Sequence, residues 1–159
     1  MSIAAILLAL AAPNFSAMLQ RQAVASNVES LVADLRLARS EAMKRGVQVE
    51  LCGVVFRNGA RDCITASNAD WAANGWMVRD VANTAIVVKV HQSVDGVGAA
   101  TASFGTGNSS FVFNPTGALA RGAGHLFIQP RDTSQTAAQQ IVCIATTGRP
   151  RVEKGADEC

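Results

Sequence analysis

The sequence predicts an α+β protein in which one long N-terminal helix packs across an antiparallel β-sheet head. An apolar N-terminal run continues directly into an amphipathic helical pattern. Short apolar segments separated by turn residues fill the rest of the chain. No long helical pattern lies between those segments, as a parallel βαβ sheet would require. The length of 159 residues fits a single domain.

The composition excludes several classes of protein. Hydrophobic residues make up 49% of the chain and charged residues only 16%, which is incompatible with long intrinsic disorder. Only one stretch is apolar enough to enter lipid, so the chain is not a polytopic membrane protein. The formal net charge of +2 is too small to indicate a nucleic-acid-binding protein by bulk charge. Any binding of anions must therefore depend on a local group of basic residues rather than on the net charge.

Residues 3–13 form an uncharged apolar run that is about half the roughly 20 residues needed to span a bilayer. Three interpretations are open. The run is the apolar region of a secretory signal with a cleavage site at Ala9-Leu10-Ala11, a buried core helix, or the C-terminal half of a membrane helix. A signal peptide would carry a positive n-region, which the chain lacks, and a core helix would have a polar face. The third interpretation is favoured, and its apolar residues are Ile3, Ile6, Leu7, Leu8, Leu10 and Pro13.

The helical pattern becomes amphipathic after Asn14. Apolar residues recur at spacings of three and four on one face, namely Val24, Val28, Leu31, Leu35, Ala38 and Ala42. Charged residues, Asp34 among them, are expected on the remaining surface. Gly46 follows two basic residues and predicts the helix end. The chain thus divides into an apolar membrane or fibre-core helix segment (1–22), its amphipathic continuation (23–46) and a β-rich head (47–159), with a bend in the helix at Pro13.

Six short segments of the head have strand composition: residues 47–56, 76–79, 85–92, 111–113, 125–129 and 140–145. Turn sequences separate them, for example Asn74-Gly75 and residues 114–117. Trp71 and Trp76 flank Asn74-Gly75 and are expected to cover the sheet edge. His91 and His125 each stand alone in the sequence and are expected to be surface or packing residues.

Four cysteines, Cys52, Cys63, Cys143 and Cys159, allow three disulfide pairings. The local pairing, Cys52 with Cys63 and Cys143 with Cys159, closes two short loops and contributes about 3 kcal/mol for each. Zinc-type spacing is absent from the sequence, so no metal is expected. Disulfides indicate an oxidising compartment such as the bacterial periplasm. Catalytic motifs of hydrolases and metalloproteases are also absent, and neither an enzyme activity nor a cofactor is predicted.

The sequence resembles the type IV pilin-like proteins, in particular the FimT/FimU and GspH group of minor pilins and pseudopilins. The similarity spans nearly the whole chain. The stretches that carry it are Ala11-Ala12-Pro13-Asn14-Phe15, Leu35-Arg36-Leu37-Ala38-Arg39-Ser40-Glu41-Ala42, Leu51-Cys52, Gly75-Trp76-Met77-Val78, Phe113-Asn114-Pro115-Thr116-Gly117 and Gly148-Arg149-Pro150-Arg151.

The resemblance implies a non-enzymatic subunit that is held in the bacterial inner membrane by one helix, with a periplasmic head, and is then assembled with other pilins into a pilus or pseudopilus. Family members carry a basic leader and a processing site ahead of the apolar run, where a prepilin peptidase cuts. Here Met1-Ser2 leads straight into that run, so the peptidase is expected as a partner only if a leader exists upstream. A secreted periplasmic binding domain is the alternative if the apolar run is cleaved off.

The resemblance to FimT-like proteins also implies double-stranded DNA binding through a C-terminal Gly-Arg-x-Arg motif, for DNA uptake in transformation. The matching residues are Gly148, Arg149 and Arg151, with Lys154 as a third phosphate contact. The motif is expected in a stiff turn held out by a Cys143–Cys159 disulfide. The competing interpretation is a pseudopilin of type II secretion, or a pilus-priming subunit, whose arginines are only solvated. Residues 149–159 hold equal numbers of basic and acidic side chains, which favours weak binding.

Overall fold

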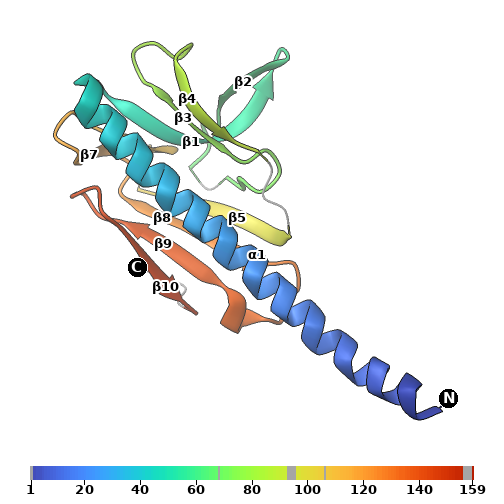
Figure 1. Cartoon of the computed structure of the whole chain (residues 1–159). Coiled ribbons are helices and arrows are strands. Elements are labelled where there is room, and N and C mark those ends of the chain that lie inside the picture. Colours follow the sequence, from blue (N-terminus) through green and yellow to red (C-terminus); the bar gives the residue numbers. More distant parts are fainter. Residues whose placement is uncertain (1, 68, 93–95, 106, 156–158) are drawn as a thin grey trace.

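A single long helix lies diagonally across two antiparallel sheets, and its N-terminal part extends beyond the head (Figure 1). The computed structural model describes residues 2–67, 69–92, 96–105, 107–155 and 159; for residues 2–14 it describes the backbone only. The elements are α1 (Ser2–Arg45), β1 (Val49–Arg57), β2 (Ala60–Cys63), β3 (Trp76–Asp80), β4 (Val87–His91), β5 (Val97–Phe104), β6 (Ser110–Phe113), β7 (Leu119–Arg121), β8 (Gly124–Pro130), the 3-10 helix η1 (Thr136–Ala138), β9 (Gln140–Ile144) and β10 (Pro150–Lys154). The predicted α+β class is confirmed.

Helix α1 ends where the sequence predicts. Gly46 has a left-handed φ of +67°, and its N–H donates to the Ala42 carbonyl, which closes the last turn. Helical geometry continues through Pro13. Side chains of the predicted fibre-core residues, from Ile3 to Pro13, lie outside the described part of the chain. Within the part that is described, no helix is both long and apolar enough to cross a membrane.

The head consists of two sheets in the orders β4-β3-β1-β6-β7 and β10-β9-β8-β5, with β2 paired to the end of β1. Every predicted strand segment overlaps an observed strand. Four strands were not predicted: β2, β5, β7 and β10. Strand β5 is rich in Gly, Ala, Ser and Thr, and β10 begins with proline and is mostly polar, so neither has strand composition.

The apolar stripe of α1 packs into the space between the sheets. Val24, Leu31 and Leu35 have no exposed surface, and Val28, Ala38 and Ala42 are buried with them. The stripe meets core side chains from both sheets, such as Leu51 of β1 and Val142 of β9. The predicted docking face of the helix is therefore its observed docking face.

Two expectations about polar and aromatic residues were wrong. Trp71 and Trp76 do not cover a sheet edge, because both are fully buried. Asp34 was expected on the helix surface but is 1% exposed. Its carboxylate accepts a 2.9 Å hydrogen bond from Trp76 Nε1 and a 2.5 Å hydrogen bond from Lys89 Nζ. These partners explain why a carboxylate is tolerated in the core.

Candidate nucleic-acid interface

The C-terminal hairpin β9–β10 carries the basic motif. Strand β10 pairs with β9 in antiparallel register, with Arg151 opposite Cys143 and Lys154 opposite Gln140. The expectation that the whole motif forms a turn was wrong. Only Gly148 and Arg149 lie in the connection, whereas Pro150 opens β10 and Arg151 lies within it. The backbone of this segment is ordered by the ladder to β9 rather than by the turn alone.

Gly148 has a packing role in this hairpin. Its φ of +73° is left-handed, and a Cβ at this position would lie 2.4 Å from the carbonyl oxygen of Gly117. The Leu119 N–H also donates a 2.9 Å hydrogen bond to the Thr146 carbonyl, which joins the hairpin to the β6–β7 turn. Gly148 therefore seats the hairpin closely against the rest of the head, and only glycine permits this approach.

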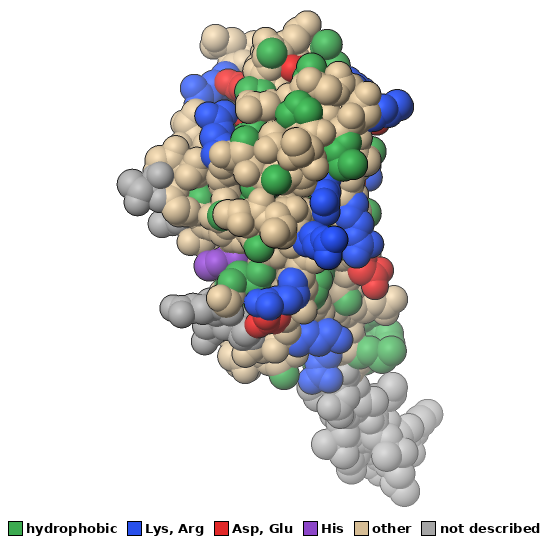
Figure 2. Space-filling view, turned by 90° about the vertical axis from the view of Figure 1, so that its left-hand side faces the viewer, with side chains coloured by type: hydrophobic (Ala, Val, Ile, Leu, Met, Phe, Trp, Pro, Cys, Tyr) green, Lys and Arg blue, Asp and Glu red, His purple; other side chains and the backbone are tan. Residues whose placement is uncertain are grey.

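Arg149 and Arg151 line the same hollow, which has a volume of about 400 Å³. His125, Cys143 and Arg151 lie opposite one another on β8, β9 and β10, so they form a row across the sheet. The Cys143–Cys159 disulfide also lines the hollow and ties the C-terminal residue to β9. Lys and Arg side chains gather on this side of the molecule, with a few acidic groups beside them (Figure 2).

The two arginines differ in their partners. Arg151 has a side chain that is 68% exposed and forms a 2.8 Å ion pair with Glu153, two residues along the same strand. Arg149 is exposed and has no ion-pair partner among the residues that the structure describes. Arg149 is thus the guanidinium of the motif that no carboxylate of the described residues neutralises.

Lys154 does not join the two arginines. Side chains alternate along a strand, so Val152 and Lys154 face the helix side of the hairpin, whereas Arg151 does not. Lys154 and Val152 accordingly line a different groove, of about 420 Å³, with Arg36 of α1. The expected third phosphate contact therefore lies on the other face of β10 from Arg151, because the two residues are an odd number of positions apart in the strand.

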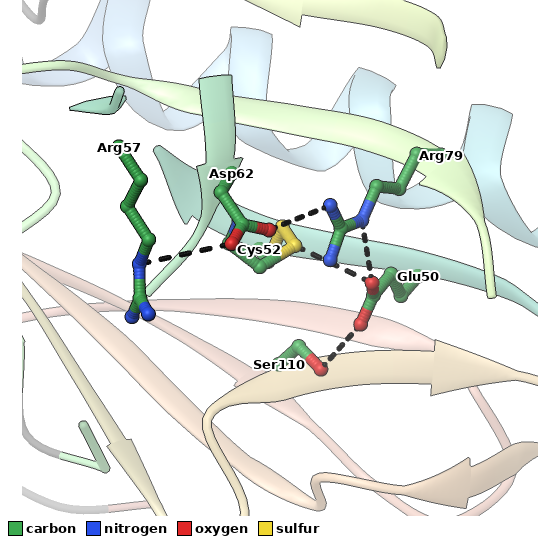
Figure 3. Close-up of a disulfide and its surroundings, with 7 residues drawn as sticks. Glu50, Cys52, Arg57, Asp62, Arg79 and Ser110 are labelled. Atoms are coloured by element: carbon green, nitrogen blue, oxygen red, sulfur yellow. Dashed lines mark hydrogen bonds and ion pairs between the residues drawn. A yellow bond between two sulfur atoms is a disulfide. The ribbon is translucent and has the colours of Figure 1, made fainter. Parts of the chain in front are cut away.

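A second polar cluster surrounds the other disulfide, Cys52–Cys63 (Figure 3). Arg79 Nε donates to Glu50 at 2.7 Å and Arg79 Nη1 donates to Asp62 at 2.9 Å, while Ser110 donates to the second oxygen of Glu50 at 3.0 Å. The hydrogen bond from Arg79 lowers the pKa of Asp62 below its usual range. Sequence reasoning missed this cluster. The signal was Glu50, a charged residue inside an apolar strand.

The Glu50 cluster fits a structural role better than a binding role. The Sγ atoms of Cys52 and Cys63, which lie beside Glu50, are bonded to each other and therefore do not offer thiolates to a metal. The buried charges of Glu50 and Arg79 neutralise each other. The cluster joins β1, β2, β3 and β6, which hold its side chains. The arginine hairpin is consequently the better candidate site.

A long helix packed by its C-terminal half onto an antiparallel head is the architecture of pilin-like proteins. A family model described as "Type II transport protein GspH" matches residues 27–148, and the chain belongs to this family. The matched range ends at Gly148, so Arg149 and β10 lie beyond it.

Two solved structures of the type IV minor pilin FimU from Pseudomonas aeruginosa share the fold. One, in space group P21, is 19% identical with a TM-score of 0.60 and covers 87% of this chain and 96% of its own. The other, in space group P65, is 19% identical with a TM-score of 0.55 and covers 84% and 98%. No curated protein matches the sequence.

Proposed function

We propose that this chain is a non-enzymatic minor subunit of a type IV pilus or a type II secretion pseudopilus, and that its β9–β10 hairpin binds double-stranded DNA. Membership of the GspH family supports the first part. The apolar segment of residues 1–22 would hold the subunit in the inner membrane, with its head in the periplasm, and would later pack among helices of neighbouring subunits. In this role the protein assembles and presents a surface.

The observation that carries the DNA-binding part is the position of the Arg149 guanidinium. It is exposed, unpaired within the described part of the chain, and lines one hollow with Arg151. Guanidinium groups form two parallel hydrogen bonds with phosphate oxygens. A phosphate at the hollow would also compete with Glu153 for Arg151, so that both arginines contact the DNA backbone.

The hairpin is built to bind at low entropic cost. Its strands are paired in register, Gly148 is seated against Gly117, and Cys159 is tied to Cys143. A site that is already ordered loses less conformational freedom on binding. Two phosphate contacts give a slope of about −2 in a plot of log affinity against log salt, so one copy binds weakly and in a salt-sensitive way.

The test is a fluorescence polarisation titration of a labelled DNA duplex with the whole chain at low salt. R149Q combined with R151Q removes both guanidiniums and should abolish most of the binding. R131Q is the matched control, because Arg131 is also exposed, is unpaired within the described residues, and follows the far end of β8. Binding that is unchanged in the double variant would remove the hairpin from the account.

The second candidate is a pseudopilin of type II secretion, or a pilus-priming subunit, that binds no DNA. The ion pair of Arg151 with Glu153 favours it, since half of the motif is already neutralised. The titration separates the two: the second candidate predicts no polarisation change for the unaltered chain even at low salt.

A further inference from the structure

Unpaired basic side chains are concentrated where α1 lies beside β10. Among the described residues, ion pairs engage Lys44, Arg45, Arg57, Arg79, Lys89 and Arg151. Of the basic residues outside these pairs, four belong to α1 and the β9–β10 hairpin at one place: Arg36, Arg39, Arg149 and Lys154.

Two sets of contacts place these residues: Arg36 shares a groove with Lys154, and Arg39 lies near the turn that carries Arg149. Arg36 of α1 and Lys154 of β10 line one groove, which Val152 of β10 also lines. Arg39 Nε lies 2.9 Å from the position that a Cβ of Gly117 would take, and the Gly117 carbonyl in turn lies against Gly148. Arg39 therefore lies beside the turn that carries Arg149. Arg36 and Arg39 share one side of the helix because they are three residues apart.

The spacing of these groups suits a DNA backbone. Strand β10 rises about 3.3 Å per residue, so Arg149 and Lys154 are separated by about 16 Å along the hairpin. A DNA strand carries one charge per about 3.4 Å of helix axis and also winds around that axis, so this length spans fewer than about five phosphates of one strand. Glu29 lines the same groove as Arg36 and lies two helical turns before it. Its charge would repel a phosphate and so marks the end of the basic row.

We propose that Arg36 and Arg39 of α1, together with Lys154, form a second phosphate-binding row, so that one DNA strand runs from the Arg149 turn along the groove between α1 and β10. This inference rests on the proposed DNA binding and extends its footprint from the hairpin to the helix. The groove supplies an apolar surface at Val152, which is 39% exposed, for the deoxyribose between successive phosphates.

The salt dependence of binding tests the second row. Arg149 and Arg151 together with the three cations of the second row predict a slope of about −4 to −5 for the whole chain, against about −2 for the hairpin arginines alone. R36Q combined with R39Q leaves three contacts, so it should reduce the slope to about −3 and weaken binding roughly tenfold at low salt. R36K combined with R39K keeps the charges and should keep the slope. R131Q is the control for an exposed arginine elsewhere, and circular dichroism checks the fold of each variant.

The outcomes separate this inference from the proposed function. Binding that depends on Arg149 but keeps its slope and affinity in R36Q/R39Q overturns the second row and leaves the hairpin site intact. If the unaltered chain does not bind DNA, or if its binding does not depend on Arg149 and Arg151, both the second row and the hairpin site are wrong. Loss of affinity in R36Q/R39Q that R36K/R39K restores supports the second row.

Discussion

Asp34 and Trp76 lie 42 residues apart in the sequence, yet the Nε1–H of Trp76 donates a 2.9 Å hydrogen bond to the Asp34 carboxylate inside the core. The Trp76 ring also stacks on the imidazole of His91, with ring centroids 4.0 Å apart. Lys89 completes the cluster from the exposed side. These contacts fix α1 to the β3–β4 edge of the first sheet, opposite the side on which the arginine hairpin meets the helix.

Substitution D34A should destabilise the protein by about 2–3 kcal/mol, because it leaves the buried Trp76 N–H without an acceptor and Lys89 without its partner. D34N keeps an acceptor oxygen and should cost less. Urea unfolding measures the change in the free energy of unfolding for D34A and for D34N. E29A, an exposed acidic position on the same helix, is the control and should change stability by no more than about 0.5 kcal/mol. Equal stabilities of D34A and E29A would contradict the role given to this carboxylate.

Substitution G148A should destabilise the protein by about 2 kcal/mol or more. The left-handed conformation raises the free energy of an alanine by about 1–2 kcal/mol. Its Cβ would also displace the β6–β7 turn at Gly117. Gly155 provides the control, since its φ is +65° and nothing lies within 4 Å of an added Cβ. G155A should therefore show only the conformational cost. Thermal unfolding compares the two variants. An equal loss of stability in G148A and G155A would refute the packing role of Gly148.

Removal of the Cys143–Cys159 disulfide by C143S and C159S should cost about 3 kcal/mol. It should also weaken DNA binding, because the hairpin loses its anchor, while the salt slope stays unchanged since no charge is removed. C52S combined with C63S is the matched control: it should lower stability similarly but leave DNA affinity intact. Equal effects of both pairs on DNA affinity would show that general destabilisation, not hairpin order, is responsible.

Stability should fall as the pH drops below about 6.5 because of His91. Burial lowers the pKa of His91 from its ordinary value of 6.5, and the charge of Asp34 opposes this only in part. In that range the unfolded chain binds a proton that the folded chain does not, so protonation favours unfolding. H91F keeps a ring against Trp76 but cannot titrate. Urea unfolding at about pH 7.5 and about pH 5.5 should show a smaller pH effect in H91F than in the unaltered chain. An identical pH effect in both proteins would remove His91 as its cause.

Periodicity was a sufficient guide to the helix and to its docking face. Val24, Leu31 and Leu35 are buried as their spacing predicts, because a helix next to a sheet must place one apolar side inward. The same periodicity held the signal for Asp34, which lies three residues after Leu31 on the buried side. Asp34 was nevertheless expected on the helix surface, because a single carboxylate is normally exposed to water.

Strand β10 and the division of the basic motif required the tertiary structure. Residues 150–154 have no strand composition, and their conformation comes from pairing with β9 and from the disulfide to Cys159. Only the observed strand shows that Lys154 faces away from Arg151. The proximity of Arg39 to the Arg149 turn is equally absent from the sequence, because it arises from packing between segments that are far apart in the chain.

The most direct test of the central claim is a nuclear magnetic resonance titration of the uniformly ¹⁵N-labelled whole chain, in detergent micelles, with a short DNA duplex. We expect the largest amide shift changes at Gly148, Arg149 and Arg151, and we expect R149Q to suppress them. Changes confined to the β1–β2 hairpin, or an unchanged spectrum at low salt, would contradict it.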